Sequence, residues 1–180
     1  MQTRSTPRAL AVLASLVVAL LFAPPASADD WQLTGAGVRT RTVESFEFAI
    51  YDIQHFVRGP LAEKSKHRVM VADVSKKVVW TMRRDVKAET MQSALRGGFA
   101  RNGYADSSKI ALFVNAFHNL HAGQRVTITY DTDRKLTVLA IEGGSAVAVV
   151  GVEFMRAVWA QWFGGTDQPA LGEQLIAKLP

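Results

Sequence analysis

The stretch LTGAGVRTRTV, from Leu33 to Val43, carries the strongest information about the fold. Alternation along a strand predicts that one face carries Leu33, Gly35, Gly37, Arg39, Arg41 and Val43. Glycine weakens a strand interior and commonly marks a bulge or a close approach by another backbone or a ligand. Two glycines beside Arg39 therefore predict a hollow with a guanidinium at its rim. An apolar molecule with a carboxylate suits such a hollow, because guanidinium binds carboxylate through two hydrogen bonds.

The same pattern has a purely structural alternative. In this alternative the two glycines form a bulge in an edge strand, and both arginines face water. The residue pattern of this stretch leaves both alternatives open, so the rest of the chain has to separate them.

The first 28 residues are typical of an export signal. Arg4 and Arg8 precede an uninterrupted apolar run over residues 9–23, and Pro24-Pro25 leads to the small-residue cleavage site Ala26-Ser27-Ala28. The apolar run is shorter than the ~20 residues of a membrane-spanning helix. We therefore expect removal of residues 1–28 and a periplasmic or secreted protein, with an uncleaved anchor as the alternative. No later stretch is long and apolar enough to predict a membrane span.

Removal of the leader leaves residues 29–180, which is the size of one domain. This part holds 19 basic and 16 acidic residues, a net charge of +3 without any block of like charge. Its densest basic cluster, KSKHR at 64–68, has no interleaved aromatic residue, so we expect a solvated loop and no nucleic-acid partner. The absence of cysteine excludes disulfides, thiolate metal sites and cysteine nucleophiles. Nothing in the sequence indicates the oligomeric state.

Strands are predicted mainly in two parts of the domain. Residues 45–57 alternate and predict a strand. The β-branched runs RVMVADV and KVVWTMRR predict a first hairpin over 68–84. The runs QRVTITY and KLTVLAI predict a second hairpin, which turns at the Asp-rich segment 131–134.

Helices are predicted between and after these strands. Residues 86–96 predict a helix with Asp85 as N-cap and Gly97-Gly98 as its stop. Further apolar stripes predict helices from Ser107 or Ser108 to Leu120, over 152–163, and from Pro169 onward. This order favours an α+β fold, in which a large antiparallel sheet is covered on one face by helices.

Conventional catalytic and metal-binding patterns are weak. His118 and His121 are three residues apart, but no third ligand has a suitable spacing, so no metal is expected. No nucleophile elbow surrounds any serine. The GAG sequence at Gly35 precedes a strand rather than a helix, which is not the arrangement of a phosphate loop. We expect no cofactor.

Several longer stretches resemble a known family. GAGVRTRTVESFEFAIYDIQHFV resembles the opening strands of the chalcone isomerase fold, where G-x-G-x-R leads into a second strand. RRDVKAETMQSAL, GQRVTITYDTD and GVEFMRAVWAQWFGG…LGEQLIAKL are similar to exported bacterial chalcone isomerase-like proteins. The resemblance covers nearly all of the chain after the leader. It implies an open-faced β-sandwich, with a ligand cleft between a large antiparallel sheet and a layer of helices.

The resemblance also implies roles for individual residues. Arg39 falls on the family's key arginine, which helps to hold the substrate in the plant enzymes. Tyr51 stands at the position of the active-site threonine, and Met91 is nearest to the catalytic tyrosine. The family's asparagine is replaced by Gly98 or Phe99. Because this polar set is incomplete, we assign no catalytic residues.

Members of this fold that bind fatty acids are known, and there the arginine meets the carboxylate. By this resemblance Arg39 would bind a carboxylate, Tyr51 would add a hydrogen bond, and Met91 and Leu95 would line the acyl chain. Our leading hypothesis is therefore an exported, non-catalytic domain that binds a small apolar or amphipathic carboxylic acid. The alternatives are an intramolecular lyase or isomerase of chalcone isomerase type, and a structural or interaction domain without a ligand.

Overall fold

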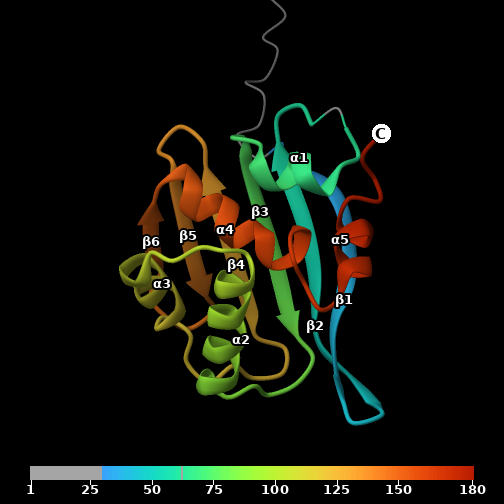
Figure 1. Ribbon diagram of the computed structural model, residues 1–180, viewed down its shortest axis with the longest axis vertical. Coiled ribbons are helices and arrows are strands. Elements are labelled where there is room, and N and C mark those ends of the chain that lie inside the picture. Colours follow the sequence, from blue (N-terminus) through green and yellow to red (C-terminus); the bar gives the residue numbers. More distant parts are fainter. Residues whose placement is uncertain (1–29, 62) are drawn as a thin grey trace, which may run out of the picture. The chain divides into compact units, whose positions relative to one another are not determined.

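The computed structural model describes residues 30–61 and 63–180, so the predicted leader lies outside the described residues. Residues Trp31–Pro180 form one unit. Within it, the strands form one antiparallel sheet in which neighbours in sequence are neighbours in space (Figure 1). The strands are β1 (Gln32–Val43), β2 (Phe46–Arg58), β3 (Ser75–Met82), β4 (Arg125–Asp131), β5 (Leu136–Ile141) and β6 (Val147–Val150).

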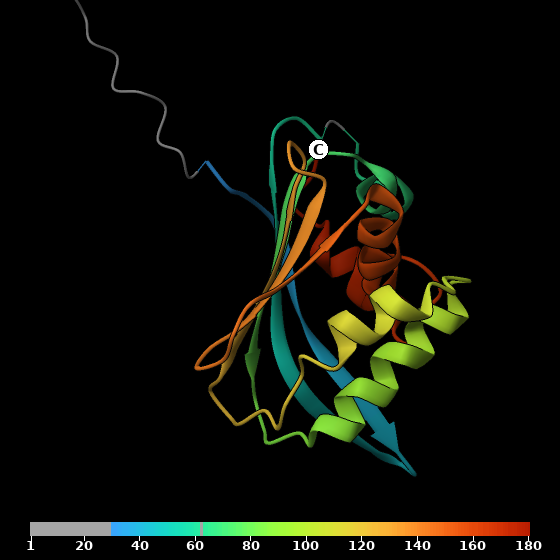
Figure 2. The same ribbon diagram turned by 90° about the vertical axis from the view of Figure 1, so that its left-hand side faces the viewer.

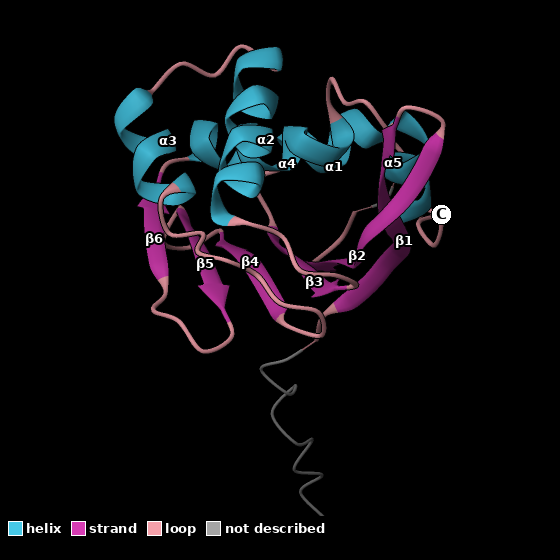
Figure 3. Cartoon of the chain, turned by 90° about the horizontal axis from the view of Figure 1, so that it is seen from below, coloured by secondary structure: helices cyan, strands magenta, loops and turns pink. Residues whose placement is uncertain are grey.

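The helices pack on one face of this sheet and leave the other face open (Figures 2 and 3). They are α1 (Lys66–Val71), α2 (Ala88–Arg101), α3 (Ser107–Val114), α4 (Val152–Phe163) and α5 (Pro169–Leu175). The predicted open-faced α+β fold is confirmed. None of the helices within the described residues is both long and apolar enough to cross a bilayer.

A single hydrophobic core fills the space between sheet and helices. α4 is the central helix of this layer, because both of its tryptophans and most of its other apolar residues are buried. Trp80 on β3 is fully buried and contacts Trp162 edge to face, with ring centroids 5.5 Å apart. The strand predicted over 45–57 and the hairpin predicted over 124–141 are confirmed. The second strand of the first predicted hairpin, at 77–84, is confirmed as β3, whereas β6 was not predicted.

The prediction of a strand at residues 68–74 is wrong, because this segment forms α1 and the turn that follows it. Ser65 caps α1 by accepting a hydrogen bond from the Arg68 N–H. At the other end, the buried Lys76 Nζ lies 2.6–3.1 Å from three backbone carbonyl oxygens, those of Val69, Met70 and Ala72. Burial lowers the Lys76 pKa to about 7, and its amino group donates hydrogen bonds to the free carbonyls at the C-terminus of α1. Hydrogen bonds to these carbonyls stabilise the helix, which helps to explain why a β-branched run folds this way.

The bounds of two helices also differ from those predicted. α2 begins at Ala88 and continues through Gly97-Gly98 to Arg101, while Asp85 accepts from the Ala122 N–H instead of capping α2. A Cβ at Gly98 would overlap the Gln161 side chain, so this glycine allows α4 to approach α2 and does not end the helix. α3 ends at Val114 rather than at Leu120, although Leu120 is buried and bridges Val86.

The basic cluster at 64–68 was predicted as a solvated loop, and its last three residues belong to α1 instead. His67 and Arg68 remain exposed there, and Lys66 forms an ion pair with Glu173 on α5.

Candidate ligand-binding site

The first two strands place Arg39 directly opposite Tyr51. Their Cα atoms are partners in the antiparallel pairing of β1 and β2. Immediately after this pair, Thr40 is opposite Ala49, so Ile50 is an extra residue in β2. A bulge of this kind redirects side chains and is common beside binding sites. Arg41 lies beyond the bulge and is exposed, whereas Arg39 is only 21% exposed.

The predicted single face of β1 is interrupted near its start. Thr34 is an extra residue in β1, so Leu33 is opposite Phe56 while Gly35 is opposite the buried His55. Gly35, Gly37 and Arg39 do follow one another on the side that α5 covers. The register of a strand with a bulge cannot be predicted from alternation alone.

The hollow predicted above the two glycines is occupied by α5, so that interpretation is wrong. A Cβ at Gly35 would overlap the carbonyl oxygen of Gln174 and lie 2.5 Å from the Leu175 carbonyl carbon. A Cβ at Gly37 would overlap the Gln174 side chain and lie 2.6 Å from Leu171 Cδ1. Gly35 therefore allows the backbone of α5 to approach the strand, and Gly37 leaves room for two α5 side chains.

Arg39 is held by the segment between α4 and α5. Its Nη2 lies 2.8 Å from both carboxylate oxygens of Asp167, and its Nη1 donates to Gln168 Oε1 at 3.3 Å. Burial is the largest single influence on the Arg39 pKa and lowers it, but the hydrogen bond to Asp167 and the charge interactions with Tyr51 and Asp167 together outweigh burial and raise the pKa. The same hydrogen bond lowers the pKa of Asp167. Both groups are therefore charged, and a carboxylate is already the partner of Arg39.

Gln168 connects this segment to the outer edge of β1. Its side-chain oxygen accepts from the Thr40 N–H at 3.0 Å, and its Nε2 donates to the Val38 carbonyl at 3.0 Å. An unpaired strand edge offers such groups, and an amide side chain can satisfy both of them. Gln168 thereby fixes the start of α5 against the strand that carries Arg39.

Tyr51, opposite Arg39 on β2, lies in an aromatic environment. Its ring stacks on Trp80 with centroids 4.6 Å apart, and its hydroxyl oxygen accepts from Trp162 Nε1 at 3.2 Å. Burial raises the pKa of Tyr51, so the phenol stays protonated. Indole nitrogen only donates, so the phenol hydrogen is not used in this contact. Among the described residues, no atom accepts a hydrogen bond from the Tyr51 hydroxyl. The buried Trp80 N–H also lacks an acceptor there.

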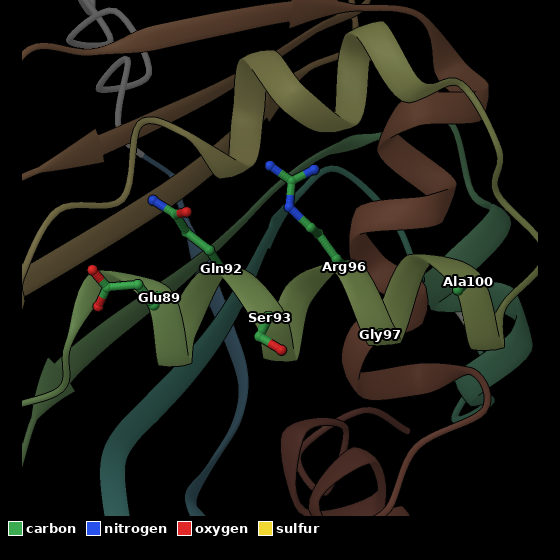
Figure 4. A pocket seen from close by; sticks show the side chains of 6 residues that line it. All are labelled: Glu89, Gln92, Ser93, Arg96, Gly97 and Ala100. Carbon is green, nitrogen blue, oxygen red and sulfur yellow. The ribbon is translucent and has the colours of Figure 1, made fainter.

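Met91 and Leu95 lie on the buried face of α2. Each is 6% exposed, and both belong to the same hydrophobic core as Tyr51. The opposite side of α2 carries an open, shallow depression lined by Glu89, Gln92, Ser93, Arg96, Gly97 and Ala100 (Figure 4). Arg96 and Gln92 there bind to Asn115 and to the Phe117 carbonyl, so this polar surface serves the packing of α3. None of the predicted site residues lines it.

A buried chain of hydrogen bonds holds the elements around the site together. Trp159 Nε1 on α4 donates to His55 Nε2 at 3.0 Å. His55 Nδ1 lies 2.6 Å from the hydroxyl of Thr34, which donates to the Leu175 carbonyl on α5 at 2.7 Å. Because the Trp159 indole can only donate, His55 Nε2 has to be an unprotonated acceptor. His55 therefore carries its single ring hydrogen on Nδ1 and is neutral. Burial, together with the nearby charge of Lys76, lowers the His55 pKa to about 3.

This neutral histidine predicts a loss of stability in mild acid. Above pH 6.5, His55 is neutral in both the folded and the unfolded chain. Between pH 6.5 and pH 3 only the unfolded chain binds a proton at this residue, so the free energy of unfolding decreases as the pH is lowered. From pH 7 to pH 4.5 this contributes about 2–3 kcal/mol, measurable by urea unfolding. His55→Gln should lack this contribution, and His67→Gln, at an exposed position on α1, should keep it. An NMR titration of the His55 ring with a midpoint near pH 6.5 would contradict the assignment.

Comparisons with known proteins identify the family and the fold of this chain. Residues 22–175 match the model of the chalcone isomerase-like family. The chain belongs to the chalcone isomerase-like family. Among solved structures, a fatty-acid binding protein of Arabidopsis thaliana matches with a TM-score of 0.64 and 15% sequence identity, over 83% of this chain and 89% of that chain. At this identity the similarity shows the fold. Comparison with curated protein sequences gave no significant match.

In this member of the chalcone isomerase-like family, the structure brings two of the four predicted site residues, Arg39 and Tyr51, opposite one another. Met91 and Leu95 share the core with Tyr51. The sequence interpretation missed Asp167 and Gln168, which are 128 and 129 residues away from Arg39 in the chain. It also gave no site role to Trp162, which donates to the Tyr51 hydroxyl. No spacing in the sequence signals these contacts, because they depend on how α5 packs.

Proposed function

We propose that this chalcone isomerase-like protein binds a small amphipathic carboxylic acid, of the fatty-acid type, at Arg39 and does not transform it. The family membership and the fold shared with a fatty-acid binding protein support a binding function. The carboxylate of the ligand would bind to the guanidinium of Arg39, and the apolar part would insert between the sheet and α2, where the core side chains would move apart to admit it.

The observation that carries the proposal is the pair formed by Arg39 and Tyr51. Arg39 is mostly buried and holds a carboxylate, that of Asp167. Next to it, Tyr51 has a buried hydroxyl hydrogen without an acceptor among the described residues. Buried donors are normally satisfied, and an unused donor indicates a bound water or ligand. A ligand carboxylate at Arg39 could accept from both groups.

The surroundings of this pair suit an apolar chain. Tyr51 lies among Trp80 and Trp162, and the same core includes Met91 and Leu95 on α2. Methionine is an adaptable side chain that fits irregular apolar shapes. We therefore place the apolar part of the ligand along Met91 and Leu95, with entry past Arg39.

The polar groups support binding better than catalysis. Cyclisation of a chalcone requires donors that stabilise a developing enolate. Met91, which stands nearest to the family's catalytic tyrosine, carries a thioether that can only accept weakly. Arg39 with Tyr51 can hold an anion, but they provide few of the donors needed for the reaction.

The test compares decanoate with 1-decanol, which has the same chain without a carboxylate. We expect decanoate to bind to delipidated protein at least about tenfold more tightly, since a hydrogen bond to a charged group contributes ~1.5–3 kcal/mol. Trp80 and Trp162 lie beside Tyr51, so tryptophan fluorescence should report binding. Equal affinity for the acid and the alcohol would contradict the proposal.

We further propose that the protein acts outside the cytoplasm, in the periplasm or after secretion. The pattern of residues 1–28 supports this proposal. Those residues lie outside the described part of the chain. Intact-protein mass spectrometry that gives the mass of a chain beginning at Asp29 would support cleavage after Ala28.

A further inference from the structure

The group that occupies Arg39 is itself a carboxylate from the same chain. Asp167 is the more exposed partner, with 53% of its side chain accessible compared with 21% for Arg39. Both of its oxygens lie 2.8 Å from Arg39 Nη2. Asp167 therefore has the chemistry and the position of a ligand head group, and it can be reached from solvent.

The backbone on both sides of Asp167 is fixed by other contacts. On one side, the Asn102 side chain accepts from the Gly165 N–H at 2.7 Å and donates to the Gly165 carbonyl at 3.1 Å. On the other side, Gln168 is bound to the edge of β1 through Thr40 and Val38. Rotation of the Asp167 side chain would leave all of these hydrogen bonds intact. Exchange of carboxylates at Arg39 thus requires no opening of a loop.

We propose that Asp167 is an internal competitor for the ligand carboxylate at Arg39. This inference rests on the proposed function and adds how the site selects its ligand. When an amphipathic acid binds, its carboxylate replaces that of Asp167, and the Asp167 side chain turns into solvent. In the absence of ligand, Asp167 keeps the partly buried guanidinium paired.

The competition selects for acids with an apolar chain. One carboxylate replaces another at Arg39, so the loss of the exposed ion pair with Asp167 offsets part of what the ligand carboxylate gains there. A tethered carboxylate has an effective concentration of about millimolar or more, and a small acid such as acetate therefore competes poorly. An acid with an alkyl chain adds the burial of apolar surface, which Asp167 cannot match. The ligand class is thus a long-chain carboxylate rather than carboxylates in general.

The test removes the charge of Asp167 and keeps its shape. Asp167→Asn is expected to bind decanoate about two- to fivefold more tightly than the wild-type protein, which is the range of exposed ion pairs. Binding of 1-decanol should not change, because the alcohol does not require Arg39. The matched control is Glu173→Gln, which removes the same charge from α5, where Glu173 pairs with Lys66 at 2.8 Å. In an Arg39→Gln background, Asp167→Asn should have no effect on decanoate.

The outcomes separate this inference from the proposed function. If Arg39→Gln weakens decanoate binding but Asp167→Asn leaves it unchanged, the proposed function stands and the competition is wrong. If Glu173→Gln tightens binding as much as Asp167→Asn, the effect is a general one of charge, and the competition is also wrong. If decanoate binds no better than 1-decanol to the wild-type protein, to Asp167→Asn and to Glu173→Gln, the proposed function and the inference fail together.

Discussion

Replacement of Arg39 by glutamine is expected to weaken decanoate binding by at least about tenfold. The change removes the guanidinium, and a hydrogen bond to a charged group contributes ~1.5–3 kcal/mol, where 1.4 kcal/mol is a factor of ten. Affinity for 1-decanol should change little, so the preference for the acid should disappear. Isothermal titration calorimetry of both ligands measures the two effects separately.

Arg41→Gln is the matched control for this variant. Arg41 lies two residues further along the same strand, and it is exposed beyond the bulge. The two variants remove the same charge from the same edge of the sheet, so long-range attraction of an anion changes equally. Decanoate affinity in Arg41→Gln should stay close to that of the wild-type protein. An equal loss in the two variants would contradict a specific role for Arg39.

Replacement of Gly35 by alanine is expected to lower the free energy of unfolding by about 3 kcal/mol or more. The new Cβ would overlap backbone atoms of Gln174 and lie 2.7 Å from the Leu175 carbonyl oxygen. Backbone cannot rotate out of the way, so α5 has to move, and overpacking typically costs 1–3 kcal/mol or occasionally more. The hydrogen bond from Thr34 to Leu175 would weaken as well. Urea unfolding followed by circular dichroism measures the change.

Two other glycines provide controls for this prediction. In Gly37→Ala the new Cβ would overlap the ends of the Gln174 and Leu171 side chains, which can rotate away. The free energy of unfolding should therefore fall by only about 1 kcal/mol. Gly97→Ala on α2 meets nothing within 4 Å and should stabilise the protein by about 0.5–1 kcal/mol. If Gly35→Ala is no more damaging than Gly37→Ala, the close approach of α5 to β1 is not as described here.

The layout of the sheet and helices follows from local patterns in the sequence. Alternation in residues 45–57 predicts β2, and the runs at 124–130 and 135–141 around an Asp-rich turn predict β4 and β5. Each of these strands has one buried face. The apolar stripe over 152–163 predicts α4. The glycine and arginine pattern predicts that Arg39 shares a face with Gly35 and Gly37, and the family resemblance points to Tyr51 as a second site residue; in the structure Tyr51 is opposite Arg39.

The remaining features depend on contacts between distant segments. Residues 68–74 have the composition of a strand, yet they form α1 because Ser65 and Lys76 bind its two ends. The glycines of β1 predict a close approach, but the sequence does not say that a helix rather than a ligand makes it. The pairing of Asp167 with Arg39 likewise requires the position of α5, which no local pattern contains.

The position of the carboxylate in a crystal structure with decanoate tests the central claim most directly. We expect carboxylate oxygens about 2.7–2.9 Å from the Arg39 guanidinium, with the Asp167 side chain turned away into solvent. We also expect the alkyl chain to lie along Met91 and Leu95. A decanoate molecule bound elsewhere, with the pair of Arg39 and Asp167 unchanged, would contradict the claim.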